Sequence, residues 1–280
     1  MFFSAGATLQ QCQQRRDTQP LDALETRLLL SHVLGLSRIE LITQSERVIS
    51  ATEAAQLDAL FQRRIDGEPM AYILGQREFY GLMFHVSPAV LIPRPDTELL
   101  VELALQRLPP SGSVVDLGTG SGAIAVVLAQ QRPDAAVTAL DLSAAALDIA
   151  RANASRHGTQ VRFLQSDWYS ALQQQNCEKF DLIVANPPYI VQGDIHLSQG
   201  DLRFEPIDAL TDHADGLSAL RRIITDAPQH LAADGWLLME HGYDQAAAVR
   251  QLLTVQGFRE AQSWHDLSDI QRVSGARRPL

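Results

Sequence analysis

The tetrapeptide Asn186-Pro187-Pro188-Tyr189 has the residue types needed to hold a planar NH2 group. Proline carries no backbone N–H, so the two prolines fix the backbone and leave carbonyl groups that only accept hydrogen bonds. The side-chain oxygen of Asn186 and the carbonyl oxygen of Pro187 can then each accept one hydrogen of the NH2 group. The ring of Tyr189 offers a flat face to the group that bears this nitrogen. We therefore assign all four residues to acceptor binding, and Asn186, Pro187 and Tyr189 to catalysis.

A second chemically informative pattern is the glycine-rich run that follows a short apolar stretch at 114–115. Glycines at such a point let the chain turn sharply and let a ligand approach the main chain. The run also satisfies the dinucleotide pattern Gly-x-Gly-x-x-Ala, so by itself it predicts a nucleoside cofactor without fixing its kind. The residues that we assign to the cofactor here are Asp116, Gly118, Thr119, Gly120, Ser121 and Gly122.

Acidic residues at three successive strand ends favour S-adenosylmethionine over NAD. Asp116 lies two residues before the first glycine, where it can bind the amino group of a methionine moiety but would repel a pyrophosphate. Asp141 closes the next strand and can accept both ribose hydroxyls. Asp167 follows the third strand and can accept from the adenine amino group. The remaining residues of the predicted cofactor site are Leu142, Trp168, which would form an apolar wall, and Asn186.

This combination suits methyl transfer to a weakly nucleophilic nitrogen. The lone pair of an amide nitrogen is delocalised, and acceptors aimed at its hydrogens stabilise the positive charge that develops as it attacks. A sulfonium methyl group is already activated, so positioning can supply much of the rate. The reaction needs no strong general base before transfer, and no such base is evident near the tetrapeptide.

The elements around these residues alternate between strands and helices. We predict strands at 114–116, 136–141, 161–165, 180–185 and 236–240, and helices at 122–131, 143–156, 217–231 and 245–256. Such alternation forms a parallel, doubly wound sheet, which binds ligands at the carboxyl ends of its strands. Two closing strands at 258–263 and 270–274 have no helical pattern between them, so we expect them to pair antiparallel.

The chain before this region has a different character. Apolar residues recur at helical spacing around Leu24, Leu28 and Leu29 and again within 52–65, and Gly35 is a helix stop. We expect residues 1–75 to form a helical domain that recognises the substrate. Residues 76–95 would form a β-hairpin linker around Gly81, and residues 96–280 the catalytic domain.

Composition excludes several classes of protein. The chain has 280 residues, is 46% hydrophobic and carries 23 basic and 33 acidic side chains, for a net charge of −10. The part beyond residue 86 has a net charge of −8, which argues against a basic nucleic-acid groove. Lys179 is the only lysine, which argues strongly against a Schiff-base lysine and a Walker-type loop. Cys12 and Cys177 have no metal-ligand spacing, and we expect no metal. We also expect a cytoplasmic protein, because no signal peptide or membrane span is evident.

Together these motifs resemble class I methyltransferases that act on planar NH2 groups. Four further segments make the chain similar to the HemK/PrmC family, the glutamine N5-methyltransferases of peptide chain release factors. These segments are Glu78–Gly81, Leu91–Glu98, Phe204–Pro206 and Leu238–Gly242. The likeness extends from about Tyr72 to the C-terminus, whereas residues 1–71 agree in helical character and length.

The resemblance implies a fold and a reaction. The fold is α/β and Rossmann-like, a mostly parallel seven-stranded sheet with an antiparallel C-terminal strand, preceded by a small helical domain. The reaction moves a methyl group from S-adenosyl-L-methionine, leaving S-adenosyl-L-homocysteine, to the glutamine of the Gly-Gly-Gln motif in bacterial release factors. Arg94 would bind substrate as a second wall of the acceptor pocket, or would pair with Glu98. Glu205 would border the pocket or cap a loop, and His241 would be a packed, hydrogen-bonded residue.

Other activities share parts of the pattern. A glutamine methyltransferase of a ribosomal protein would carry the same tetrapeptide. An adenine-N6 DNA methyltransferase uses this turn on a flipped base but should carry a basic groove. An NAD-dependent oxidoreductase leaves the tetrapeptide without a role, and the intact acids disfavour a non-catalytic module with a vestigial cofactor site. We expect release factors as partners, no direct contact with nucleic acid, and no membrane.

Overall fold

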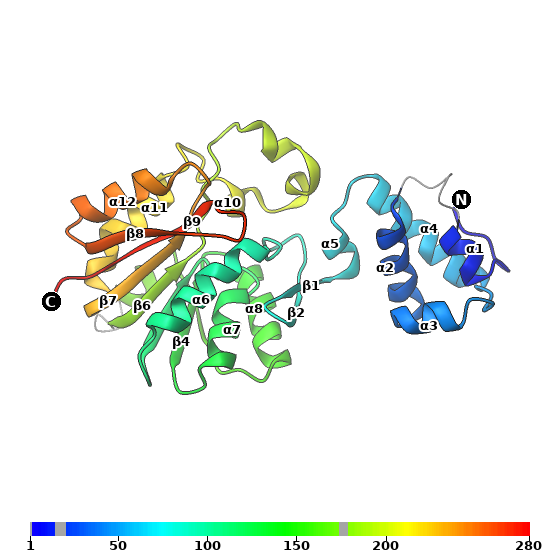
Figure 1. Ribbon diagram of the computed structural model, residues 1–280, viewed down its shortest axis with the longest axis horizontal. Helices are drawn as coiled ribbons and strands as arrows, with labels where there is room; N and C mark the ends of the chain where they lie inside the picture. The colour runs from blue at the N-terminus through cyan, green and yellow to red at the C-terminus, as the bar shows by residue number, and fades with distance from the viewer. Residues whose placement is uncertain (1, 15–20, 174–178) are drawn as a thin grey trace. The chain divides into compact units, whose positions relative to one another are not determined.

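The computed structural model describes residues 2–14, 21–173 and 179–280, so Cys177 of the sequence analysis lies outside the described residues. The chain divides into two compact units, unit 1 (Met1–Gly75) and unit 2 (Gln76–Leu280) (Figure 1). Each unit buries its own hydrophobic core. Among the described residues, no helix combines the length and the apolar character needed to span a membrane.

Unit 1 is built from helices around a core that includes Leu9, Leu29, Leu57 and Phe61. These helices are α1 (Leu9–Gln14), α2 (Ala23–Leu34), α3 (Arg38–Thr43), α4 (Ala51–Ile65) and α5 (Met70–Leu74). Both α3 and α4 begin with a capping box, in which a serine and a glutamate satisfy each other's backbone N–H groups.

The predicted stop of α2 is confirmed, because Gly35 follows the helix in the left-handed conformation. The prediction of which leucines of this helix are buried is partly wrong. Leu29 and Leu30 are buried, whereas Leu24 and Leu28 are exposed. The packing of α2 against α4 decides this orientation, and the spacing of leucines on one helix does not contain that information.

Unit 2 opens with the predicted hairpin, β1 (Gln76–Phe79) and β2 (Leu82–His85), paired antiparallel. Its two turn residues, Tyr80 and Gly81, both have positive φ, as two-residue hairpin turns require. The buried Asn153 side chain joins this hairpin to the glycine loop. Its Oδ1 accepts the backbone N–H of His85 at 2.7 Å, and its Nδ2 donates to the carbonyl oxygen of Ser121 at 2.8 Å.

Within the described residues, unit 2 contains a seven-stranded sheet of order β5-β4-β3-β6-β7-β9-β8. The strands are β3 (Ser113–Leu117), β4 (Ala136–Asp141), β5 (Arg162–Gln165), β6 (Phe180–Ala185), β7 (Leu231–Glu240), β8 (Arg259–His265) and β9 (Gln271–Arg277). The first five are parallel, and β9 runs antiparallel to both β7 and β8. This confirms the predicted fold class. The strand order reverses between β3 and β6, which is where open parallel sheets bind ligands.

Alternate residues of the strands pack into two hydrophobic cores on opposite faces of the sheet. Val114 and Leu182 belong to the core beneath α6, α7 and α8, whereas Val115 and Ile183 belong to the core beneath α11 and α12 (Figure 1). The α-helices and 3-10 helices of unit 2 are η1 (Pro95–Thr97), α6 (Glu98–Arg107), α7 (Ala123–Gln131), α8 (Ala144–Arg156), α9 (Ser170–Gln173), η2 (Ile195–Ser198), η3 (Gly200–Phe204), α10 (Ile207–Leu210), α11 (Ser218–Asp226), η4 (Ala227–Gln229) and α12 (Ala246–Val255). The helix predicted at 217–231 is shorter, because Pro228 falls within η4 and β7 begins at Leu231.

Candidate active site

The carboxyl ends of neighbouring strands bring the predicted functional residues to one edge of the sheet. Asp116 lies near the end of β3, Asp141 ends β4 and Asn186 directly follows β6. Glu240 ends β7, the strand next to β6. The parallel sheet thus brings the residues predicted to bind the cofactor and those predicted to bind the acceptor to one edge.

The glycine loop is tied to the end of β4. Gly118, Gly120 and Gly122 all have positive φ, which lets the chain turn from β3 into α7. The N–H groups of Gly118 and Thr119 both donate to the carbonyl oxygen of Leu140, at 2.8 and 2.9 Å. The N–H of Gly120 donates to the Asp141 carboxylate at 2.8 Å. Hydrogen bonds within the chain therefore hold the shape of this loop.

Asp116 is buried beneath this loop with its hydrogen bonding incomplete. The Thr119 hydroxyl donates to its Oδ2 at 2.6 Å, while its Oδ1 has no partner among the described residues. Burial raises the pKa of Asp116 to about 7, and nearby Asp141 acts in the same direction, whereas the Thr119 hydrogen bond opposes the rise. An ammonium group placed here would supply the missing donors and favour the ionised carboxylate.

Asp141 keeps acceptor capacity for a sugar. Its two oxygens accept the N–H groups of Gly120 and Ser143, each at 2.8 Å, which leaves further lone pairs for ribose hydroxyls. Burial raises the pKa of Asp141, and these backbone hydrogen bonds oppose the rise. Leu142 beside it is exposed.

The two residues predicted to contact adenine, Trp168 and Asp167, have different surroundings. Trp168 lies beside the glycine loop, since a Cβ added to Gly118 would meet its ring at 3.7 Å. Asp167 is half-exposed and makes a two-pronged ion pair with Arg222 of α11, at 2.9 and 2.8 Å. Sequence reasoning did not find Arg222, because the pairing joins segments 55 residues apart.

An open pocket lies at the tetrapeptide predicted to bind the acceptor, with about 380 Å³ of empty space that includes solvent at its mouth. The described residues that line it are Leu91, Arg94, Asn186, Pro187, Tyr189, Ile190, Leu202, Ala209, Leu210 and Glu240. The lining is thus mostly apolar with a few polar groups, as is typical of a small-ligand site. Pro188 is half-buried and lies outside the described lining.

The second wall of this pocket is fixed by a buried carboxylate. Glu205 forms an ion pair with Arg94, and its Oε2 accepts the N–H of Ile92 at 3.0 Å. Burial raises the pKa of Glu205, and the neighbouring Arg94 guanidinium opposes the rise. The alternative pairing of Arg94 with Glu98 is wrong, because Glu98 instead accepts the N–H of Tyr80 at 2.9 Å at the hairpin turn.

Sequence reasoning missed Glu240, a buried carboxyl group that lies beside the tetrapeptide. The Tyr189 hydroxyl donates to Glu240 Oε1 at 3.2 Å, because β7 lies next to β6. Burial raises the pKa of Glu240 to about 7, and it also raises the pKa of Tyr189. The available signal was an acid at the end of a predicted strand. His241, the next residue, is buried and hydrogen-bonded to Gly242 and Ser274, as predicted.

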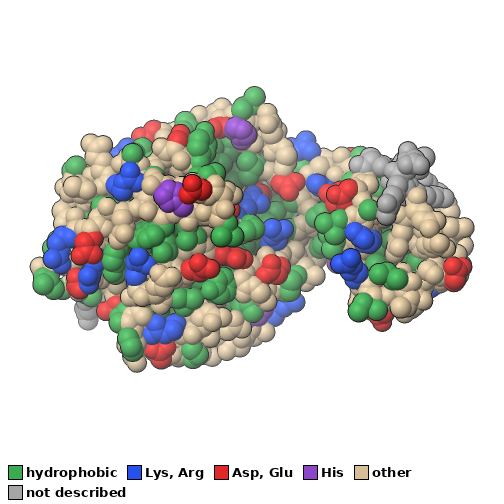
Figure 2. All heavy atoms as spheres, viewed as in Figure 1, with side chains coloured by type: hydrophobic (Ala, Val, Ile, Leu, Met, Phe, Trp, Pro, Cys, Tyr) green, Lys and Arg blue, Asp and Glu red, His purple; other side chains and the backbone are tan. Residues whose placement is uncertain are grey.

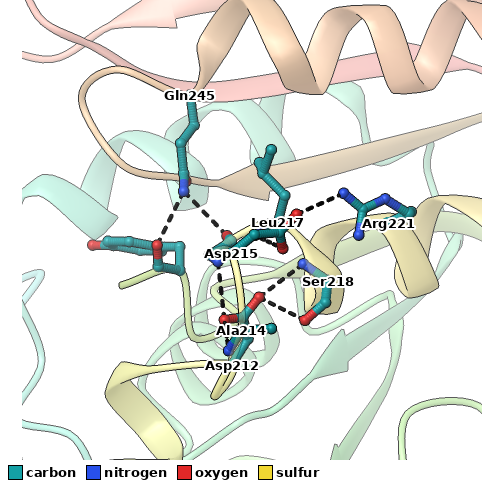
Figure 3. Close-up of polar contacts among 9 residues, drawn as sticks. Asp212, Ala214, Asp215, Leu217, Ser218, Arg221 and Gln245 are labelled. Atoms are coloured by element: carbon teal, nitrogen blue, oxygen red, sulfur yellow. Dashed lines mark hydrogen bonds and ion pairs between the residues drawn. The ribbon is translucent and has the colours of Figure 1, made fainter. Parts of the chain in front are cut away.

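A loop at 212–218 is connected to the predicted acceptor turn through hydrogen bonds of Gln245. Gln245 Nε2 donates to the carbonyl oxygens of Tyr189 and Gly216, at 3.0 and 3.1 Å (Figure 3). The Asp212 carboxylate accepts N–H groups of this loop, including that of Ser218 at 2.8 Å (Figure 3). The backbone position of Tyr189 is therefore set by a hydrogen-bonded loop that the sequence analysis did not consider.

Charge on the surface is mixed. On the face drawn in Figure 2, acidic and basic side chains of the described residues are interspersed over unit 2. A nucleic-acid groove would gather basic side chains along one path.

Comparisons with known proteins bear on both units. Residues 7–75 match the PrmC N-terminal domain, and residues 95–201 match the methyltransferase small domain. The release factor glutamine methyltransferase of Burkholderia pseudomallei (strain K96243) is 54% identical over 268 residues, which cover 93% of each chain. That of Escherichia coli (strain K12) is 45% identical and covers 90% of this chain and 91% of its own.

The fold also has solved counterparts. The 16S rRNA N2 G1207 methyltransferase of T. thermophilus, solved in complex with AdoMet and guanosine, aligns with a TM-score of 0.54 at 23% identity. The alignment covers 72% of this chain and 49% of that one, and at this identity it shows a shared fold.

Proposed function

Since the chain belongs to the family of release factor glutamine methyltransferases, we propose that it methylates the side-chain amide nitrogen of a release-factor glutamine. The methyl donor is S-adenosyl-L-methionine, and the glutamine is that of the Gly-Gly-Gln motif. The observation that carries this proposal is the pocket lined by Asn186, Pro187 and Tyr189 at the sheet edge where the cofactor residues meet. The products are S-adenosyl-L-homocysteine and N5-methylglutamine.

The residues at the glycine loop fit the proposed cofactor. When bound, S-adenosylmethionine supplies a methyl group on an activated sulfonium. The unpartnered Oδ1 of Asp116 would accept from the ammonium of the methionine moiety. Asp141 would accept from the ribose hydroxyls, and Trp168 and Asp167 would contact the adenine. Gly118, Thr119, Gly120, Ser121, Gly122 and Leu142 would form the surrounding walls.

The acceptor turn would hold the reacting amide. Asn186 Oδ1 and the Pro187 carbonyl would each accept one hydrogen of the glutamine NH2 group, and the Tyr189 ring would contact the amide plane. These acceptors stabilise the positive charge on nitrogen as the new N–C bond forms and the S–C bond breaks. The nitrogen then releases one proton to solvent water at the open pocket. Arg94, Pro188 and Glu205 would shape the pocket around the glutamine.

Unit 1 would recognise the body of the release factor, with residues 76–95 linking it to the catalytic domain. The apolar side chains of Ile39 and Ile42 on α3 are largely exposed, which supports this role. A substrate that acts in translation would place the enzyme in the cytoplasm.

The test is methyl transfer from labelled S-adenosylmethionine to purified, unmethylated release factor, with the modified peptide located by mass spectrometry. We expect a single methyl group on the glutamine of Gly-Gly-Gln. Transfer to a ribosomal protein or to DNA in place of the release factor would refute the proposed substrate. Failure to bind the cofactor would refute the assignment of Asp116 and Asp141.

A further inference from the structure

Trp168, shortly after β5, has a backbone conformation that bulky side chains rarely adopt. Its φ is +48°, in the left-handed region, which costs free energy unless the surrounding structure enforces it. Its ring lies beside the glycine loop, where a Cβ added to Gly118 would meet it at 3.7 Å. We propose that Ser166 is a positioning residue that holds the Trp168 backbone in this conformation and so keeps the ring in place for the adenine of the cofactor. This inference rests on the cofactor of the proposed function.

Ser166 directly follows β5 and is hydrogen-bonded through both its backbone and its side chain. Its backbone N–H donates to the carbonyl oxygen of Asp141 at 2.9 Å, which fixes the serine to the end of β4. Its hydroxyl donates to the carbonyl oxygen of Trp168 at 2.7 Å and accepts the N–H of Ala171 at 3.0 Å. A hydroxyl has one hydrogen to donate and two lone pairs, so both bonds can exist at once. The turn around Trp168 is therefore tied to the edge of the sheet.

Burial makes the hydroxyl of Ser166 difficult to replace by water. Ser166 is 6% exposed, so little water reaches its hydrogen bonds. The residue after Trp168 is also fixed, because Tyr169 is 1% exposed and its hydroxyl donates to the carbonyl oxygen of Ile223 at 3.2 Å. Without the hydroxyl, the carbonyl group of Trp168 would lose its bond to Ser166, and the backbone could relax to a negative φ. The ring would then move away from the glycine loop.

The position of the Trp168 ring matters because a wall that is already in place loses little conformational freedom when a ligand packs against it. Ser166 joins the residue predicted to bind the ribose, Asp141, to the residue predicted to contact adenine. The ion pair of Asp167 with Arg222 holds a neighbouring side chain, but it is half-exposed and does not involve the Trp168 backbone. Ser166 is therefore the side chain that we expect to control the ring.

The first test uses the free protein and no ligand. The chain contains three tryptophans, so labelling the whole protein with 5-fluorotryptophan gives three fluorine NMR signals, and Trp168→Phe identifies the relevant one. Ser166→Ala keeps the backbone N–H that binds Asp141 and removes only the hydroxyl. In this variant the Trp168 signal should shift, and its difference between H2O and D2O should increase because the ring becomes more exposed to water. An unchanged Trp168 signal would overturn the inference.

The second test is a double-mutant cycle on the affinity for S-adenosylhomocysteine, measured by calorimetry. Trp168→Ala should weaken binding by about 10-fold or more, because the adenine loses an aromatic contact. Ser166→Ala should weaken it by about 10-fold. Because Ser166 acts through the Trp168 ring, the double variant should bind within about twofold of Trp168→Ala. Additive losses, or wild-type affinity in Ser166→Ala, would contradict the inference.

Ser113→Ala is the matched control, because Ser113 begins β3 at the end of the strand away from the site. Its hydroxyl likewise both donates and accepts, to the Asp181 carboxylate at 3.0 Å and from the Asp181 N–H at 3.2 Å. It should leave the Trp168 signal and the affinity unchanged, and a comparable loss there would reduce the Ser166 effect to general destabilisation and so overturn the inference. If the wild type does not bind S-adenosylhomocysteine, the proposed cofactor fails, while the fluorine signals still decide whether Ser166 holds the ring.

Discussion

Two carboxyl groups in unit 2, those of Asp116 and Glu240, are fully buried with one oxygen each lacking a partner among the described residues. Burial disfavours the charged form of a carboxyl group, so keeping either group ionised costs free energy. A ligand or a neighbouring hydrogen-bond donor can reduce that cost. Both lie at the edge of the sheet where we place cofactor and acceptor. Such unrelieved polar groups are found most often at functional sites.

Replacing Asp116 by asparagine should separate stability from cofactor binding. In the wild type the folded protein keeps the Asp116 proton up to about pH 7, whereas the unfolded chain loses it near pH 4. The unfolded state therefore binds fewer protons between these pH values, and wild-type stability falls as pH rises through this window. The variant lacks this contribution, so its free energy of unfolding relative to wild type should rise by roughly 2–4 kcal/mol from pH 4 to pH 7.

Urea unfolding at several pH values would measure this difference, and a constant difference would contradict the buried charge. The same variant should bind S-adenosylmethionine about 10- to 100-fold more weakly by calorimetry, because a charged acceptor for the ammonium is lost.

Replacing Asn186 by alanine should abolish measurable methyl transfer, a loss of at least about 100-fold, because the developing charge on the amide nitrogen loses an acceptor. Cofactor affinity should fall only a few-fold by calorimetry. Near-normal turnover in Asn186→Ala would show that another group holds the amide.

At the scale of elements, the acceptor turn depends on a loop that approaches it very closely. Gly216 has a positive φ, and a Cβ added there would meet the carbonyl oxygen of Tyr189 at 2.6 Å. The loop and the turn are further joined by Gln245 and by a hydrogen bond from the Gln192 N–H to the carbonyl oxygen of Ala214 at 3.0 Å. Because Tyr189 lines the pocket, any displacement of the turn would change the shape of the pocket.

Gly216→Ala should therefore displace the turn and lower the rate of methyl transfer by about 10-fold or more while leaving cofactor affinity intact. Gly193→Ala is the control, since Gly193 has a similar φ of +80° but open space around its Cα. The two substitutions impose similar backbone strain, so their difference isolates the contact with Tyr189. Equal rates in the two variants, at equal thermal stability, would mean that the turn does not depend on this approach.

At the scale of the whole molecule, two units with separate cores divide the work that we propose. The described residues that make up the candidate active site belong to unit 2. The proposed role of unit 1 is therefore recognition of the folded release factor, a role that a short glutamine peptide would not engage.

Substituting both Ile39 and Ile42 by glutamate should test this division. Their side chains are 72% and 64% exposed, so the fold should be retained. We expect KM for intact release factor to rise about 10-fold or more, because apolar contact area is replaced by charge. Turnover of a short Gly-Gly-Gln peptide should be unchanged. Val255→Glu, at a 79% exposed position of α12, is the matched control and should alter neither. Unchanged KM in the double variant would exclude this face of α3 from recognition.

The sequence by itself determined much of unit 2. The alternation of apolar strands and amphipathic helices predicted the parallel sheet, and the period-two burial of residues such as Val114 and Val115 on opposite faces follows from strand geometry. Local signals also placed the hairpin at Tyr80-Gly81 and the end of α2 at Gly35, because turn and cap residues act over a few positions. Motif spacing sufficed to bring Asp116, Asp141 and Asn186 to one sheet edge, since parallel strands share the same end.

Tertiary structure alone decided which partners these residues meet. Arg94 pairs with Glu205 rather than with Glu98, and Asp167 pairs with Arg222, across 111 and 55 residues of chain. Glu240 reaches the Tyr189 hydroxyl because β7 pairs with β6 in the sheet. Local sequence patterns encode the conformation of a segment and the face that it buries. Contacts between distant segments depend on how all the segments pack at once, and for that reason the surroundings of the acceptor turn emerged only from the folded chain.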